Sequence, residues 1–167
     1  MSYISHIQLT ERPGARELAE VATAEHETLV DYALMEATLI GADRSAWSAD
    51  EIAVADDALQ RIDDAVSDAE SLIDGFLAQR GYLPLDPVPG VVTTWARAIT
   101  RYYLHKHRLG TDAQDPIVRD YQDAMKLLKL TAEGKFSLGA DDPVASADSM
   151  DVQFESGTRV WDGRGRY

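Results

Sequence analysis

The chain has 167 residues, contains no cysteine and carries 29 acidic residues against 16 Lys and Arg, a formal net charge of −13. The absence of cysteine excludes disulfides and thiolate metal sites, and the strong negative charge opposes binding to nucleic acid. We find neither a basic stretch followed by an apolar run, as in a secretory signal, nor an apolar run long enough for a membrane span, so we expect a soluble protein made in the cytoplasm.

The charge is unevenly distributed along the chain. Residues 1–90 hold 18 acidic residues and 5 Lys or Arg, residues 91–139 hold 5 and 8, and residues 140–167 hold 6 and 3. The net positive middle segment either meets an acidic partner surface or balances an acidic face of the same fold.

Helical periodicity dominates the first half of the chain. It predicts a short helix over Ala15–Ala22 and a second over Ala24–Ile40, with Gly41 as its stop signal. The apolar face expected for the second helix comprises Val30, Ala33, Leu34, Ala37 and Ile40.

A long helix is predicted over Ala49–Arg80. Ser48 and Glu51 form a capping-box pattern at its start, and Gly81 is placed where a left-handed residue ends a helix. One apolar stripe recurs at steps of three and four residues: Leu59, Ile62, Val66, Ala69, Ile73 and Phe76. Nearly opposite lies an exposed acidic line, Asp57, Asp64 and Asp68.

The segment Phe76–Gly90, FLAQRGYLPLDPVPG, joins the long helix to the next one. Its three prolines remove backbone donors and fix φ, which predicts a stiff connection that sets the angle between helices and does not hold a substrate. We expect Tyr82, Leu83 and Leu85 to plug the end of the core.

Two more helices follow. One, over Pro89–Leu109, has an apolar ridge and a basic stripe; the other starts at Asp115–Pro116, with proline at the first helical position, and ends at Gly134. The ridge comprises Val92, Trp95, Ile99 and Tyr102, the basic stripe comprises Arg97, Arg101, His105 and Arg108, and the buried face of the last helix comprises Ile117, Tyr121, Ala124, Met125 and Leu128.

The character of the chain changes at residue 140. A small, polar and acidic stretch precedes a segment with four large apolar side chains at no helical spacing: Phe154, Val160, Trp161 and Tyr167. This segment is either an extended arm that orders against a partner or a disordered tail with incidental aromatics. We therefore divide the chain into an all-α compact bundle of about four to five helices over residues 1–139, and a flexible linker with a C-terminal arm over residues 140–167.

No pattern in the sequence predicts catalysis. There is no phosphate-binding glycine loop, no nucleophile elbow and no spacing of His and carboxylates typical of a metal site, so we predict no catalytic, cofactor or metal residues. Three readings remain: a structural building block of an assembly, a helical adaptor or regulatory binding protein in the cytoplasm, and a small hydrolase with an unrecognised acid–base pair.

Four segments, in order, resemble a known family. They are IDGFLAQRGYLPLDPVPG (Ile73–Gly90), ITRYYLH (Ile99–His105), VRDYQDAMKLLKLTAEGKFSLG (Val118–Gly139) and, before them, LTERPGARELAEVAT (Leu9–Thr23). Together they are similar to proteins encoded in the head-to-tail joining region of Mu-like phages and prophages. The resemblance covers about residues 7–139.

This sequence departs from the family pattern at two places. Residues 25–50 are longer than the usual connection before the long helix, and Arg159–Trp161 with Arg164 and Tyr167 is only loosely similar to the family's tail.

The resemblance implies a head-completion, or neck, protein. Such proteins form a ring, of twelve copies by resemblance, below the portal; they extend the channel for double-stranded DNA and dock tail-side or stopper proteins. This implies a location in the virion neck, after a stage in the host cytoplasm. Because a ring needs one face of a subunit to meet a different face of its neighbour, we predict that Arg97, Arg101 and Arg108 contact Asp57, Asp64 or Asp68, within the subunit or across to the next.

Overall fold

The structure is a computed structural model that describes residues 2–108 and 115–139. The predicted linker and arm, residues 140–167, lie outside the described residues. So does residue 109, at which the helix after the proline-rich segment was predicted to end.

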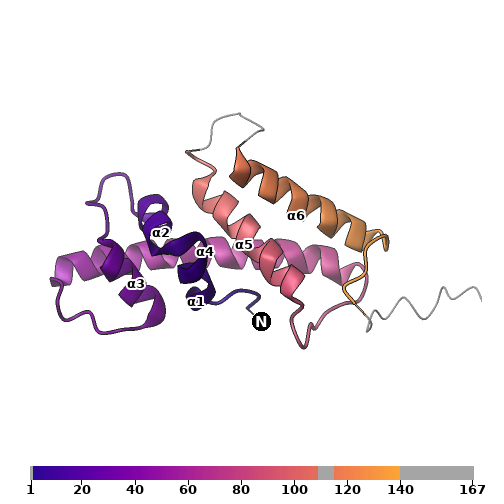
Figure 1. Ribbon diagram of the computed structural model, residues 1–167, viewed down its shortest axis with the longest axis horizontal. Helices are drawn as coiled ribbons and strands as arrows, with labels where there is room; N and C mark the ends of the chain where they lie inside the picture. The colour runs from indigo at the N-terminus through magenta and orange to yellow at the C-terminus, as the bar shows by residue number, and fades with distance from the viewer. Residues whose placement is uncertain (1, 109–114, 140–167) are drawn as a thin grey trace, which may run out of the picture.

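The described residues form helices and connections without a strand (Figure 1). This confirms the all-α prediction of four to five helices, since five helices have eight residues or more. In chain order the elements are α1 (His6–Leu9), a kinked turn η1 (Thr10–Gly14), α2 (Ala15–Ala22), α3 (Tyr32–Ile40), α4 (Ala49–Ala78), α5 (Gly90–His105) and α6 (Pro116–Ala132).

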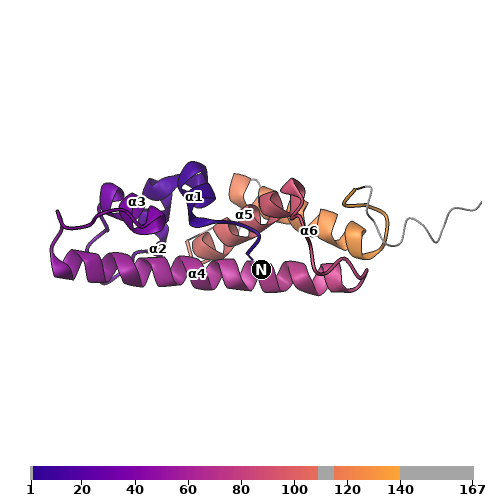
Figure 2. The ribbon, with the colours of Figure 1, turned by 90° about the horizontal axis from the view of Figure 1, so that it is seen from below.

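Helix α4 is the spine of the molecule. Its 30 residues extend for about 45 Å at the α-helical rise, and the predicted capping box is present: the Ser48 side chain accepts from Glu51 N–H while the Glu51 carboxylate accepts from Ser48 N–H. In Figure 2 all the other helices lie on one side of α4, with α1–α3 over its first half and α5 and α6 over its second. Among residues 2–108 and 115–139, one side of α4 is therefore left without a covering helix.

The buried stripe of α4 is built largely from alanine. Small side chains let the backbones of neighbouring helices approach closely, so a single helix accommodates two groups of partners. The predicted stripe is confirmed at its centre, whereas Leu59 and Phe76 at its ends are only half-buried. The buried residues of α4 are Ala55, Ala58, Ile62, Ala65, Val66, Ala69, Ile73 and Leu77.

The prediction of one helix over Ala24–Ile40 is wrong for its first eight residues. Helix α3 begins at Tyr32, because the Asp31 carboxylate caps it by accepting from two backbone N–H groups, at 2.9 and 3.2 Å. Residues 24–31 form a non-helical connection. A hydrogen bond closes it, in which Val30 N–H donates to the Thr23 hydroxyl oxygen at 3.4 Å.

The shorter helix also changes which side chains are buried. Val30, Leu34 and Ala37 are buried as predicted, whereas Ala33 and Ile40 are exposed. Five of the nine residues of α3 are buried, and at 100° per residue they span roughly 200° of its circumference, so it packs over a broad face: Leu34, Met35, Ala37, Thr38 and Leu39.

The proline-rich segment closes the core at the far end of α4. Tyr82 and Leu85 are buried and Leu83 is half-buried, which confirms the predicted plug. Helix α4 ends at Ala78, two residues before the prediction, and Gly81 takes the left-handed conformation expected after a helix (φ 72°).

Helices α5 and α6 follow the predicted order with adjusted ends. Pro89 precedes α5 as its N-cap residue, and α5 ends at His105, earlier than the predicted Leu109. Asp115 caps α6 by accepting from the backbone N–H of Ile117 at 2.8 Å. Helix α6 ends at Ala132, two residues before the predicted stop at Gly134.

The turn after α6 is locked against the end of α4. Gly134 has φ 74°, and a Cβ atom added there would lie 2.7 Å from the guanidinium of Arg80. Glycine is favoured at this position by the left-handed backbone conformation, whereas the flexible end of Arg80 could shift to admit a Cβ atom.

Sequence reasoning missed the first ten residues as a structural element. Tyr3 is buried, its hydroxyl donates to the Asp74 carboxylate, and its backbone N–H donates to Glu70 at 2.6 Å. His6 contacts Asp63 at 2.6 Å, so the N-terminal segment is fastened to α4 at three acidic residues. A local signal existed: Ser5 and Gln8 form a capping box at the start of α1.

Candidate subunit interface

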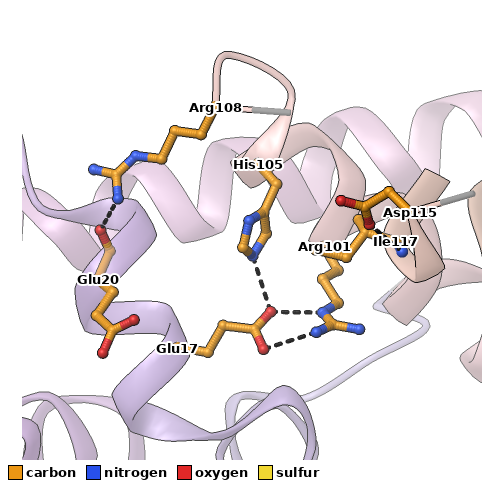
Figure 3. A network of polar contacts seen from close by, with 7 residues as sticks. All are labelled: Glu17, Glu20, Arg101, His105, Arg108, Asp115 and Ile117. Atoms are coloured by element: carbon orange, nitrogen blue, oxygen red, sulfur yellow. Dashed lines mark hydrogen bonds and ion pairs between the residues drawn. The ribbon is translucent and has the colours of Figure 1, made fainter. Parts of the chain in front are cut away.

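The basic stripe of α5 faces α2 within the same subunit. Arg101 donates from Nε and Nη2 to the two carboxylate oxygens of Glu17, at 2.5 and 2.8 Å, and His105 Nε2 lies 2.9 Å from the same carboxylate (Figure 3). This geometry is a bidentate, charge-assisted pair that joins segments 84 residues apart.

The electrostatics of this cluster favour its charged form. Burial raises the pKa of Glu17, but hydrogen bonds from Arg101 and His105 outweigh that effect, so its pKa falls below the ordinary value. The hydrogen bond to Glu17 in turn raises the pKa of the Arg101 guanidinium. The carboxylate and the guanidinium therefore stabilise one another in the folded protein.

Arg108 makes a second connection to α2. Its guanidinium donates to the backbone carbonyl of Glu20 at 2.5 Å, in the last turn of α2 (Figure 3). A cation at that position satisfies a helix-end carbonyl and complements the negative end of the helix dipole.

Arg97 occupies a different position from the other two arginines. It is half-buried, its Nε has no hydrogen-bond partner among the described residues, and it lines a groove of about 740 Å³ between η1, α5 and α6. The groove has mixed chemistry; its charged residues are Arg12, Glu17, Arg97, Arg101, Asp120 and Asp123, and its apolar residues include Pro13, Val91, Trp95 and Leu127.

The predicted acidic line of α4 is exposed, as expected. Asp57 pairs with Arg61 on the same helix at 2.9 Å, and Asp64 accepts from the Gln60 side-chain amide at 2.9 Å. Asp68 is exposed beside them. The line borders the covered side of α4 at two places: Arg61, the partner of Asp57, also donates to the Ala22 carbonyl of α2 at 3.5 Å, and Asp68 interacts electrostatically with Tyr103 of α5.

The structure therefore does not bring the two predicted sets together inside the subunit. Among the described residues, Arg101 and Arg108 bind α2, and their acceptors are Glu17 and the Glu20 carbonyl. The part of the prediction that places these arginines against a neighbouring copy stays a prediction. The four predicted arm residues, Phe154, Val160, Trp161 and Tyr167, lie outside the described residues.

Sequence reasoning missed Glu17 as the acceptor of the basic stripe. Both elements were predicted as helices, but their pairing depends on how α2 crosses α5, which local periodicity does not encode. The aromatic contact between α5 and α6 was predicted only as buried faces; Tyr102 and Tyr121 stack with ring centroids 4.0 Å apart and planes 11° apart.

The chemistry available at this surface is ion pairing and hydrogen bonding between helices. Among residues 2–108 and 115–139, no three His, Asp or Glu side chains gather as a metal site would require. In the same part of the chain, no helix combines the length and apolar character that crossing a membrane demands.

The fold and this surface define a class of protein: an all-helical chain, over the described residues, built on one long helix with its charged groups arranged for contact between helices. Residues 3–155 match the family model described as "Bacteriophage Mu, Gp36", and the chain belongs to this family. This confirms the resemblance to Mu-like phage proteins.

Two relatives show how far the similarity extends. The "Mu-like prophage FluMu protein gp36" of Haemophilus influenzae (strain ATCC 51907 / DSM 11121 / KW20 / Rd) is 35% identical over 102 residues, which are 60% of this chain and 70% of the relative. "Gene product J" of Escherichia phage Mu is 29% identical over 99 residues, which are 58% of this chain and 67% of the relative.

Proposed function

We propose that this protein is a structural head-to-tail connector of a Mu-like phage or prophage particle. In this role, copies of the chain form a ring below the portal, extend the channel through which DNA passes, and dock tail-side proteins. The protein is then a virion component of the neck that exists in the host cytoplasm before assembly, and it works by shape and contact and not by catalysis.

The observation that carries the proposal is that all other helices of the described residues lie on one side of α4 in this chain, which belongs to a Mu phage family (Figure 2). The exposed carboxylates of the acidic line lie nearly opposite the buried stripe of α4. A subunit with two chemically different sides suits a heterologous contact, in which face meets unlike face and repetition closes a ring. The net charge of −13 per copy would also let duplex DNA slide through the ring without sticking, since like charges repel.

The C-terminal arm has a separate part in the proposal. Phe154, Val160, Trp161 and Tyr167 follow an acidic linker, and such a segment can bind a partner by ordering against it. We assign it to a neighbouring ring or the portal. A chain ending at Met150 should be as stable as the full-length monomer but should fail to join heads to tails. If the truncated chain unfolds instead, the arm belongs to the hydrophobic core of the monomer.

The proposal is tested in the particle and in the purified protein. Removing the gene from an inducible prophage should leave DNA-filled heads and free tails, and supplying the gene in trans should restore joined particles. Negative-stain images of the purified protein, alone and with the portal, should show hollow rings. Joined particles in the gene's absence, or no ring under either condition, would refute the connector role.

A further inference from the structure

Helix α6 carries a second basic line, distinct from the stripe of α5. Arg119, Lys126 and Lys129 are all exposed, and none of them forms a salt bridge within the part of the chain that the structure describes. At 100° per residue the three lie within about 80° of one another, opposite the buried Ala124 and Leu128. Arg101 and Arg108, by contrast, are engaged with α2.

The spacing of this basic line matches that of the acidic line on α4. Arg119 and Lys126 are seven residues apart, as are Asp57 and Asp64, so each pair is separated by about 10 Å along its helix. The third members, Lys129 and Asp68, follow three and four residues later, so their distances along the two helices differ by less than about 2 Å.

The two lines lie on different sides of the subunit. By helical spacing the acidic line lies roughly opposite the buried stripe of α4. Helix α6 lies on the covered side of α4, at the outer edge of α5 (Figures 1 and 2). One subunit cannot join its own two lines, so a contact between them involves two copies and uses a different face of each.

We propose that α6 of one copy packs alongside α4 of the next copy in the same chain direction. The packing sets Arg119 against Asp57, Lys126 against Asp64 and Lys129 against Asp68. The inference rests on the proposed function, since it names the surfaces through which a ring of these subunits would close. The Asp57–Arg61 pair at 2.9 Å is exposed and gives way to the new partner at little cost.

This contact is dominated by exposed charges, which determines its behaviour. Each copy carries a net charge of −13, so copies repel one another except where the α6 lysines approach the α4 carboxylates. Association should therefore weaken steeply as salt rises, and in about 1 M salt, where the screening length is about 3 Å, it should be lost.

The test uses two reversed variants of the full chain. The basic-line variant is Lys126→Glu with Lys129→Glu, and the acidic-line variant is Asp64→Lys with Asp68→Lys. Each alone sets like charges against like and should associate roughly ten- to a hundredfold more weakly than the unaltered protein in sedimentation velocity at low ionic strength.

Mixing the two variants gives the decisive readout. In an alternating assembly every α6–α4 contact again joins opposite charges, so the equimolar mixture should recover association that neither variant shows. A matched control, Glu25→Lys with Glu36→Lys, changes net charge as the acidic-line variant does, at exposed sites away from both lines, and should not restore the basic-line variant. Circular dichroism confirms that each variant is folded.

The outcomes separate this inference from the connector role. Rings of the unaltered protein that persist in both variants overturn the surface assignment and leave the connector standing. A mixture that associates while the unaltered protein never forms rings supports the surfaces and counts against the ring. A mixture of folded variants that stays monomeric overturns the inference.

Discussion

Glu17 should be the carboxylate on which the attachment of α2 to α5 depends. Its side chain is 25% exposed and holds Arg101, 30% exposed, in a bidentate pair. Hydrogen bonds to charged groups contribute about 1.5–3 kcal/mol each, and partial exposure lowers that figure, so Glu17→Gln should lower the free energy of unfolding by about 2 kcal/mol. For a chain of this size the midpoint of thermal unfolding should fall by about 4–8 °C.

Glu20→Gln is the matched control. It is the same substitution one turn along α2, at a carboxylate whose partner Arg16 is largely exposed, and it should change the free energy of unfolding by less than about 0.5 kcal/mol. Urea unfolding followed by far-ultraviolet circular dichroism measures both variants. Equal effects of the two substitutions would refute the idea that burial and bidentate geometry give Glu17 its special role.

The pH dependence gives a second check on the same residue. Because folding lowers the pKa of Glu17, its stabilising contribution is present above its ordinary value of 4.5 and is lost as pH falls through the folded-state pKa. The stability difference between the unaltered protein and Glu17→Gln should therefore shrink as pH falls below about 4.5. A difference that grows in acid would contradict the assigned direction.

Three further substitutions test the core, the helix start and the N-terminal segment, each by urea unfolding. Ile62→Ala removes a fully buried side chain at the centre of α4 and should cost about 2–5 kcal/mol; a cost below about 1 kcal/mol would show that the stripe is not packed there. Ser48→Ala should cost about 1 kcal/mol through the lost cap, and Ser48→Thr should recover most of it. Tyr3→Phe removes the hydroxyl that donates to Asp74 and should lower the free energy of unfolding by about 1–2 kcal/mol. An unchanged free energy of unfolding would show that this hydrogen bond does not hold the first residues to the fold.

Local signals account for the parts of the fold that could be predicted. The helix over Ala15–Ala22 has the predicted bounds, and the starts at Ser48 and Asp115 are set by caps that a few neighbouring residues specify. The apolar period of α4 similarly marks its buried face, because every partner packs on one side of it.

The errors arose where a local signal was overridden or a distant partner decided the outcome. The pattern looked helical from Ala24 onward, but the Asp31 cap starts the helix only at Tyr32. The basic stripe of α5 was identified from its spacing, but its partner is Glu17, 84 residues away, and only the crossing of α2 over α5 determines whether such cations face solvent or another helix.

The basic stripe of α5 and the basic line of α6 differ in what they contact within the chain, and this decides how assembly should be tested. Reversing Arg101 would break the Glu17 pair and destabilise the subunit, so any loss of assembly would reflect folding as much as contact between copies. Lys126 and Lys129 are exposed on the outer face of α6, and reversing them leaves the core contacts of that helix in place. Assembly that depends on the lysines at constant stability would mean that the α5 cations hold the fold together while the α6 cations join one copy to the next.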